Sequence, residues 1–496
     1  MKICHISDTH FGSSSHHNAE ALEELLNEIR EGDFDFLIHT GDVTQSGRLD
    51  EYKMAQEFFK KLNVPYVAIP GNHDARNGGV RLFEEYIGPS NGLQETNDAI
   101  IIYVDSSVMD SNEGRVGMVK YDMMREALNE YIDKSLKIVA IHHHTIPIPM
   151  AGRERNVLSN AGDILDLLLK SDVDLVLSGH RHFPNVHEVE STLFINAGTS
   201  AGRKTRYGDV NSYDIVEIDA DTKRVTTKRL DGRVSVKEYP RQEQRIFSDM
   251  GKKLFSIAHM SNTFITDSRP FLYNHFINAV NKINKIEPDL VVHCGGVVKE
   301  GIPSDYELAS NLMSKLKSPV YYTPAGRDIN YLGYDLFPKH FGDIDQTYSD
   351  GDIVLKGVST AQYDSPIGIV GKTERKALIS DIKSREEDFK GIFLHHNLLP
   401  IPHSREKGLL EDAGDMLREV VDADIDLVLT GTSSHPHAAR VGETVIVNAN
   451  SMSSVYQRSI RGNSFNLIDI YEKVVAVYEI NSLWGTKRLK GMWSRV

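Results

Sequence analysis

The chain has 496 residues, of which 40% are hydrophobic and 25% charged, and its formal net charge is −14. These values are typical of a globular protein with an ample core, and they argue against nucleic-acid binding through bulk positive charge, leaving room only for a local basic patch. The two cysteines, Cys4 and Cys294, lie in apolar runs, which favours a reducing compartment over a disulfide framework. Neither a signal peptide nor an apolar run of roughly 18 residues is recognised, so we expect a cytoplasmic protein without membrane contact.

Apolar runs and helical stripes alternate along the first half of the chain. The runs predict strands at 1–6, 34–39, 64–69, 99–104, 137–141 and 173–177. Between them, helical spacing of apolar residues predicts helices at 19–29, 51–62 and 160–169. Two later runs, 192–195 and 212–218, are expected to close the fold as antiparallel strands. Alternation of this kind is typical of an α/β fold.

Polar side chains follow the predicted strands at the points where they end. They are Asp8 and His10, Asp42, Asn72-His73-Asp74, His142-His143-His144, and His180 with His182. In an extended chain, residues two apart face the same side, which applies to the first and the last of these pairs. Because ligand sites of parallel α/β sheets lie at the carboxyl ends of strands, we expect these groups to converge on one rim.

Seven of these side chains are candidate metal ligands: Asp8, His10, Asp42, Asn72, His142, His180 and His182. This set exceeds the needs of one tetrahedral ion and suits two ions that share a bridging carboxylate. Mixed imidazole and oxygen ligands favour Mn, Fe, Zn or Co over Ca and exclude a thiolate site. Two metal ions about 3.5–4 Å apart can clamp the attacking and leaving oxygens of a phosphoryl centre and supply hydroxide for the attack near neutral pH.

The ordered set of motifs resembles the calcineurin-like metallophosphoesterases, and within them most closely the cyclic-nucleotide and glycerophosphodiester phosphodiesterase branch. The motifs are Asp8-Thr9-His10, Gly41-Asp42, Gly71-Asn72-His73-Asp74, His142 and Gly179-His180-Arg181-His182, followed by Asn196 to Ser200 and by 212–215. The resemblance covers residues 1–235. It implies two β-sheets packed as a sandwich and flanked by helices, in α-β-β-α layers.

The resemblance also implies a role for each residue. Asp8, His10 and His182 would hold one metal, Asn72, His142 and His180 the other, and Asp42 would bridge them. His73 would contact the phosphate and protonate the leaving group, oriented by Asp74. His143 and His144 are interpreted as packing residues. Arg153, Arg155, Arg203 and Arg206 are candidates for pairing with a substrate phosphate, with solvated loop arginines as the equal alternative.

The same pattern starts again in the second half. The strand at 254–259 repeats the first strand, 289–293 repeats the second, and Pro324 to Asp328 lies over Pro70 to Asp74. His395 and His396 lie over His142 and His143. We therefore predict a tandem duplication with a boundary in 237–253: a catalytic domain over residues 1–240 and a degenerate one over 253–496.

The ligand positions in the second copy are occupied by Asn262, Phe264, Gly296, Gly326, His395, Thr432 and Ser434. Only His395 keeps its identity, and two glycines carry no side chain, so this half is predicted to hold no metal pair. His435 and His437 are interpreted as exposed loop histidines. The roles left open for this half are packing against the first, shaping the substrate entrance, binding a partner, and mediating oligomerisation.

The sequence thus predicts a metal-dependent phosphoric ester hydrolase that acts on a small phosphodiester, such as a cyclic nucleotide or a glycerophosphodiester. A nuclease of the same superfamily is the alternative within enzymes. The acidic net charge makes this alternative less favoured, because nucleic acid is itself negatively charged. A non-catalytic scaffold built on the same fold is the alternative outside enzymes. Missing ligands are its signature, and they occur in the second half alone.

Overall fold

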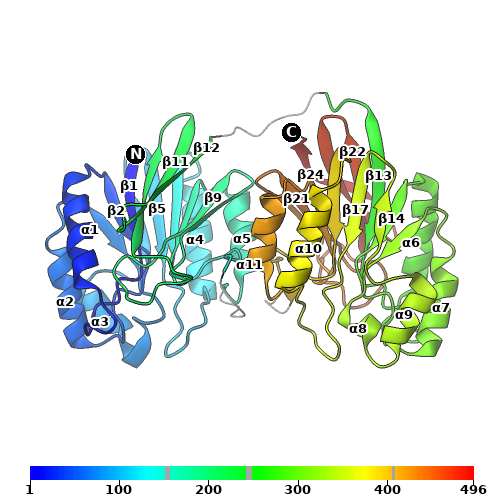
Figure 1. Ribbon diagram of the computed structural model, residues 1–496, viewed down its shortest axis with the longest axis horizontal. Helices are drawn as coiled ribbons and strands as arrows, with labels where there is room; N and C mark the ends of the chain where they lie inside the picture. Colours follow the sequence, from blue (N-terminus) through cyan, green and yellow to red (C-terminus); the bar gives the residue numbers. More distant parts are fainter. Residues whose placement is uncertain (151–156, 242–248, 405–407, 496) are drawn as a thin grey trace. The chain divides into compact units, whose positions relative to one another are not determined.

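The computed structural model describes residues 1–150, 157–241, 249–404 and 408–495. The chain forms two compact units, Met1–Arg245 and Ile246–Val496 (Figure 1). Within the described ranges, every helix is too short or too polar to span a lipid bilayer.

The first sheet of unit 1 has the strand order β12-β11-β10-β1-β2-β3. Its strands are β1 (Lys2–Ile6), β2 (Phe36–His39), β3 (Tyr66–Ala68), β10 (Ser212–Ile218), β11 (Thr222–Arg229) and β12 (Val234–Pro240). The first three are parallel, and β10 to β12 continue the sheet as antiparallel strands from the other side of β1. The predicted antiparallel strand at 212–218 is confirmed.

The second sheet of unit 1 has the order β4-β5-β6-β7-β9-β8. Its strands are β4 (Gly92–Glu95), β5 (Ala99–Val104), β6 (Leu136–Ile141), β7 (Leu175–Ser178), β8 (Asn185–Val189) and β9 (Thr192–Asn196). β9 pairs parallel to β7 and antiparallel to β8. The expectation that 192–195 is an antiparallel strand was therefore wrong for its pairing with β7. The hairpin strand β8 reverses the chain direction before β9 joins the sheet beside β7.

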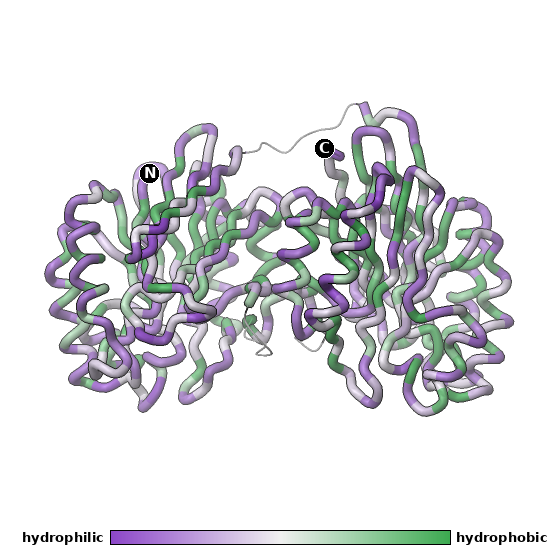
Figure 2. The backbone as a smooth tube through the Cα atoms, in the orientation of Figure 1, coloured by the Kyte–Doolittle hydropathy of each residue, from purple (hydrophilic) through white to green (hydrophobic). Residues whose placement is uncertain are grey.

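The helices of unit 1 cover the outer faces of the two sheets (Figure 1). They are α1 (Ala19–Glu31), α2 (Leu49–Phe59), the 3₁₀ turn η1 (Arg76–Gly78), α3 (Val80–Tyr86), α4 (Met118–Glu130) and α5 (Ala161–Lys170). One core cluster contains residues of both sheets, such as Ile38 and Ile138, so the sheets pack face to face. A second cluster joins the other face of the first sheet to α1, α2 and α3 through Leu25, Tyr52 and Phe83. The green strands inside and purple helix surfaces of Figure 2 follow this layering.

Unit 2 has two sheets with the corresponding orders, β15-β14-β13-β22-β23-β24 and β16-β17-β18-β19-β21-β20. Its strands are β13 (Lys253–Met260), β14 (Leu290–His293), β15 (Val320–Tyr322), β16 (Thr347–Ser349), β17 (Ile353–Gly357), β18 (Phe389–Phe393), β19 (Leu427–Thr430), β20 (His437–Val441), β21 (Thr444–Asn448), β22 (Ser464–Tyr471), β23 (Val474–Asn481) and β24 (Lys487–Ser494). Its helices are α6 (Tyr273–Ile286), α7 (Pro303–Met313), α8 (Gly326–Ile329), α9 (Gly333–Phe341), α10 (Lys372–Lys383) and α11 (Ala413–Val421). Strand for strand, the pairing directions match those of unit 1.

Candidate metal centre

The candidate ligands lie on the loops that directly follow β1, β2, β3, β6 and β7, as the order of strands in a parallel sheet requires. Several have left-handed backbone conformations: φ is 53° at Asp8, 49° at His10, 53° at Asp42, 73° at His180 and 52° at His182. Such φ values are rare outside glycine, although Asp and His tolerate them better than most residues. A cluster of them marks a place where the fold holds the backbone in a costly shape.

The first cluster consists of Asp8, His10, Asp42 and His182, all of them buried. The Nε2 atoms of His10 and His182 face each other at 3.1 Å. Asp8 Oδ1 lies 3.1 Å from His182 Nε2 and 3.8 Å from His10 Nε2, and it has no hydrogen-bond partner in the described structure. Three donor atoms therefore converge on one small volume.

The second cluster is built around Asn72 Oδ1. This oxygen lies 3.2 Å from His142 Nε2 and 2.8 Å from His180 Nδ1. The Asn72 amide is held in this orientation because its nitrogen donates to Asn112 Oδ1 at 3.2 Å.

Asp42 lies between the two clusters. Its Oδ2 is 3.9 Å from His10 Nε2 in the first cluster and 3.5 Å from His142 Nε2 in the second. Its Oδ1 accepts a hydrogen bond from the backbone N–H of His73 at 2.8 Å, which fixes the carboxylate plane. The sequence-predicted ligands are thus brought together, and Asp42 occupies the shared position.

The protonation pattern of the imidazoles fits a metal pair. His142 Nδ1 donates to the carbonyl of Thr40 at 2.6 Å, and His182 Nδ1 donates to the carbonyl of Lys204. In both rings Nε2 is therefore the nitrogen that faces the site, where it would ligate a metal ion after losing any proton it carries. Metal-binding histidines characteristically use the second ring nitrogen in this way. An all-nitrogen-and-oxygen set suits borderline transition ions.

A comparison with known proteins gives the family. Residues 1–184 match the model of the calcineurin-like phosphoesterases. The probable glycerophosphodiester phosphodiesterase GpdQ of Arcobacter nitrofigilis is 32% identical over 209 residues, an alignment that spans 39% of this chain and 74% of that protein. The chain belongs to the calcineurin-like phosphoesterase family.

Other members of the family are also similar to the chain. The 3',5'-cyclic adenosine monophosphate phosphodiesterase CpdA of Escherichia coli K12 is 25% identical over 192 residues, covering 37% of this chain and 70% of that enzyme. Among solved structures, a purple acid phosphatase from yellow lupin aligns with 47% of this chain and 52% of its own at 13% identity and a TM-score of 0.40. The family consists of metal-dependent phosphoesterases, and the buried His and Asp clusters of this phosphoesterase are consistent with the dinuclear metal site typical of it.

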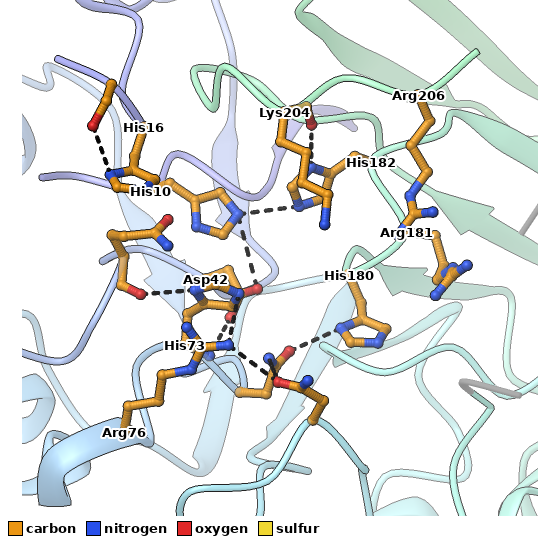
Figure 3. A pocket seen from close by; sticks show the side chains of 14 residues that line it. His10, His16, Asp42, His73, Arg76, His180, Arg181, His182, Lys204 and Arg206 are labelled. Carbon is orange, nitrogen blue, oxygen red and sulfur yellow. Dashed lines mark hydrogen bonds and ion pairs between the residues drawn. The ribbon is translucent and has the colours of Figure 1, made fainter. Parts of the chain in front are cut away.

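His73 lies at the edge of the phosphoesterase centre, with its ring 4.6 Å from that of His10. Its Nδ1 donates to the carbonyl of Gln45 at 2.7 Å, so Nε2 is the nitrogen that faces the cavity (Figure 3). The contacts of Asp74 differ from the expectation that its carboxylate orients His73. Its carboxylate accepts hydrogen bonds from the backbone N–H groups of Val43, Thr44 and Gly71 at 2.7–2.9 Å instead. Asp74 therefore shapes the loop that carries Asp42.

The cavity over the metal centre is lined by several residues that the sequence did not single out. Besides five of the candidate ligands, His73 and the candidate Arg206, its walls contain Ser15, His16, Gln45, Arg76, Asn112, Arg181 and Lys204. Of the four candidate phosphate-binding arginines, Arg206 lines the cavity, whereas Arg203 donates through Nε to the carbonyl of Ser14. Arg153 and Arg155 lie outside the described residues. Arginines in loops do not follow the residue spacing of a helix or a strand. Only their position close behind a motif could have identified them as cavity residues.

His143 and His144 are both fully or almost fully buried. His143 Nδ1 pairs with Ser106 Oγ at 2.9 Å and His144 Nδ1 with the carbonyl of Ile146 at 2.7 Å. The contact of His144 agrees with its interpretation as a packing residue. His143 differs from that interpretation, because one of its ligand atoms lies within 4.8 Å of those of His142 and His180, which makes it a further candidate metal ligand.

Burial and charge set the ionisation of the centre. Burial lowers the pKa of His10 to about 3, so its imidazole is neutral at pH 7. Burial also acts to lower the pKa of His142, but the neighbouring charge of Asp42 outweighs it and raises this pKa to about 9. Conversely, burial acts to raise the pKa of Asp42, and His142 and His73 hold it well below its usual range. Asp42 is therefore ionised, and its negative charge favours a cation beside it.

Proposed function

We propose that residues 1–240 form a catalytic domain that hydrolyses a small phosphodiester, such as a cyclic nucleotide or a glycerophosphodiester, with two transition-metal ions. The observation that carries this proposal is the position of Asp42 between two buried clusters of ligand atoms. The names of the GpdQ and CpdA relatives support the substrate class.

In this proposal Asp8, His10 and His182 hold one ion, and Asn72, His142 and His180 hold the other, with Asp42 shared. When bound, the two metal ions would supply positive charge that polarises the phosphoryl group and makes hydroxide available near pH 7. Asn112 keeps the oxygen of Asn72, rather than its nitrogen, turned toward the site. Backbone carbonyls keep the histidine tautomers in the ligating form.

His73 is proposed to be the catalytic acid. Because its Nδ1 donates to the Gln45 carbonyl, Nε2 faces the cavity, where the leaving-group oxygen of the substrate would lie. In this structure Nε2 accepts from Arg76 at 3.2 Å, so it would carry the proton for the leaving group once substrate binding has displaced that contact. Asp74 acts at a distance, through the backbone of the Asp42 loop.

The test is a metal analysis combined with a hydrolysis assay. The wild-type chain should bind transition metal and hydrolyse bis(p-nitrophenyl) phosphate and 3',5'-cyclic AMP. Asp42→Ala should lose both the metal and the activity. If the purified protein takes up no transition metal and Asp42→Ala hydrolyses as well as wild type, the proposal is wrong.

Hydrolysis of single-stranded DNA in the same panel tests the nuclease alternative. A nuclease that contacts several phosphates loses activity steeply between 50 and 200 mM salt. Hydrolysis of a small diester that fills one cavity should depend much less on the salt concentration.

For unit 2 we propose a degenerate copy of the same domain that holds no metal pair and acts as a binding or stabilising module. Gly296 stands at the place of Asp42, and a Cβ there would lie 2.5 Å from Asn262 Oδ1 and 3.0 Å from the Phe264 ring. The space that an ion and its carboxylate would need is therefore filled. Expressing residues 1–240 alone tests the assignment: full activity would make unit 2 dispensable for catalysis, and loss of solubility would point to a stabilising role.

A further inference from the structure

Arg76 is a cation beside the proposed catalytic acid that the family motifs do not assign. It begins η1, three residues after His73, and is partly exposed to the cavity. Its Nη2 lies 3.2 Å from His73 Nε2 and 3.1 Å from Asn112 Oδ1 (Figure 3). The same Asn112 oxygen accepts from Asn72, so Arg76 is one hydrogen bond away from both the acid and the second ligand cluster.

The charge of Arg76 is not neutralised by a carboxylate. Its guanidinium contacts a ring nitrogen of His73 and the amide oxygen of Asn112, and within the described residues no Asp or Glu oxygen forms an ion pair with it. Other arginines of the chain behave differently: Arg229 and Arg233 both pair with Asp209. A guanidinium held without a counter-ion at the wall of a cavity is arranged to receive an anion.

The cavity concentrates positive charge although the chain is acidic. Its lining contains Arg76, Arg181, Lys204 and Arg206 but a single carboxylate, Asp42, while the whole chain has a net charge of −14. A cleft with one sign of charge draws the opposite charge into it. Arg76 contacts both His73 and the Asn112 that orients Asn72.

Unit 2 offers an independent argument. A Cβ on Gly47 would lie 2.3 Å from the carbonyl oxygen of Arg76, and a Cβ on Gly301 would lie 1.9 Å from that of Asn330. Asn330 therefore occupies the place of Arg76 in the same backbone framework. The cation is missing in the unit that also lacks the ligand set, although the turn around it is kept. Its charge is thus tied to the site and not to the fold.

We propose that Arg76 binds an anionic oxygen of the substrate's phosphoryl group and forms a third positive centre beside the two ligand clusters. This inference rests on the proposed function of unit 1. The guanidinium would exchange its bonds to His73 and Asn112 for charge-assisted bonds to the phosphoryl oxygens, which are roughly twice as strong. The contribution should be larger for a dianionic phosphate than for the monoanion of a diester, since attraction scales with charge.

The test uses the full chain loaded with Mn²⁺ and the variants Arg76→Gln and Arg76→Lys. Arg125→Gln is the matched control, because it removes one positive charge from the exposed face of α4, where Arg125 pairs with Asp122. Inorganic phosphate binding is measured by calorimetry, Mn²⁺ content by elemental analysis, and kcat and KM with bis(p-nitrophenyl) phosphate and p-nitrophenyl phosphate.

Arg76→Gln should keep the wild-type Mn²⁺ content and bind phosphate about 10- to 100-fold more weakly, the equivalent of one lost hydrogen bond to a charged group. KM should rise more for the monoester than for the diester. Arg76→Lys should recover part of the affinity, and Arg125→Gln should match wild type.

Equal phosphate affinity in Arg76→Gln and wild type, at equal Mn²⁺ content, would overturn the inference, as would a wild-type chain that binds no phosphate. A wild-type chain that binds phosphate through Arg76 but hydrolyses none of the esters would instead overturn the proposed function. A drop in kcat alone would show that Arg76 only supports His73.

Discussion

Units 1 and 2 share a framework of buried polar contacts but differ at the ligand positions. Thr9 Oγ1 pairs with His39 Nε2 at 3.0 Å in unit 1, and Thr263 Oγ1 pairs with His293 Nε2 at 3.0 Å in unit 2. His142 and His395 both donate through Nδ1 to a backbone carbonyl at 2.6 Å. The same buried polar contacts therefore recur at corresponding places of the two units.

The loops of unit 2 that correspond to the ligand loops of unit 1 have the same backbone conformation, although their side chains differ. Asn262, Phe264, Gly296 and Ser434 all have positive φ, between 47° and 71°, as their counterparts in unit 1 do. For phenylalanine this conformation is a genuine outlier. The strained conformation accompanies the proposed metal ligands in unit 1 and different side chains in unit 2, so the backbone shape of these loops does not depend on the ligand side chains.

The largest expected effect concerns the catalytic acid. His73→Asn should lower kcat for a diester about 10²- to 10⁴-fold, because proton donation to the leaving group is lost. Steady-state kinetics measures it, with metal content as the check that the centre is intact. Arg327→Asn at the corresponding place in unit 2 should leave kcat unchanged, and a similar loss there would show that unit 2 takes part in catalysis.

The next effect tests a contact common to both units. Asp74 accepts backbone N–H bonds in unit 1, and Asp328 accepts those of Gly296, Val298 and Ala325 in unit 2 at 2.7–3.0 Å. Replacing either by Ala leaves buried donors unpaired and should reduce the free energy of unfolding by about 3 kcal/mol or more.

Urea unfolding measures this loss, and Asp50→Ala, an exposed position on α2, is the control. Asp74→Ala should also reduce activity because the Asp42 loop loses its anchor. Asp328→Ala should destabilise without slowing hydrolysis. Full stability in both variants would contradict the structural role.

A third prediction asks whether the lost carboxylate can be restored. Gly296→Asp should destabilise the chain by about 1–3 kcal/mol, because its Cβ overlaps Asn262 and Phe264. Gly351→Asp is a matched control, since Gly351 also has a positive φ, 96°, but an added Cβ there meets nothing within 4 Å. Combining Gly296→Asp with Phe264→His should regain part of the stability, measured by urea unfolding. Equal effects of the two single variants would mean that backbone strain, not crowding, is the obstacle.

The smallest effect concerns pH. Burial raises the pKa of Asp214 to about 7, whereas in unit 2 the neutral Asn466 lies against His259, as Asp214 lies against His5. A carboxyl with a pKa raised by folding retains its proton longer in the folded state, so its contribution to stability falls as pH rises from about 4 to 7.

Asp214→Asn should therefore gain stability relative to wild type, on the order of 2 kcal/mol, between pH 5 and pH 8. Urea unfolding at both pH values measures the difference, with the exposed Asp221→Asn as control. A difference between Asp214→Asn and wild type that does not change with pH would show that Asp214 is ionised throughout.

Much of the fold and of the site follows from local patterns. Apolar runs placed β1, β2, β5 and β6 to within about two residues, and donor side chains directly after strands gave candidate ligands that lie close together in the structure. The helix at Met118–Glu130 was missed, because its apolar stripe is weak and Met118 and Val119 are exposed. The parallel pairing of β9 with β7 was missed because pairing direction depends on which hairpin precedes the strand.

By itself, the sequence determined which atoms are available for ligation and their order along the chain, because each residue type fixes the chemistry of its own side chain. Only the tertiary structure decided how these atoms are directed. The carbonyls of Thr40, Gln45 and Lys204 select the histidine tautomers, yet every residue has a carbonyl, so no sequence signal marks these three. The same holds for Arg76, whose approach to His73 and Asn112 depends on how two separate loops meet over the cavity.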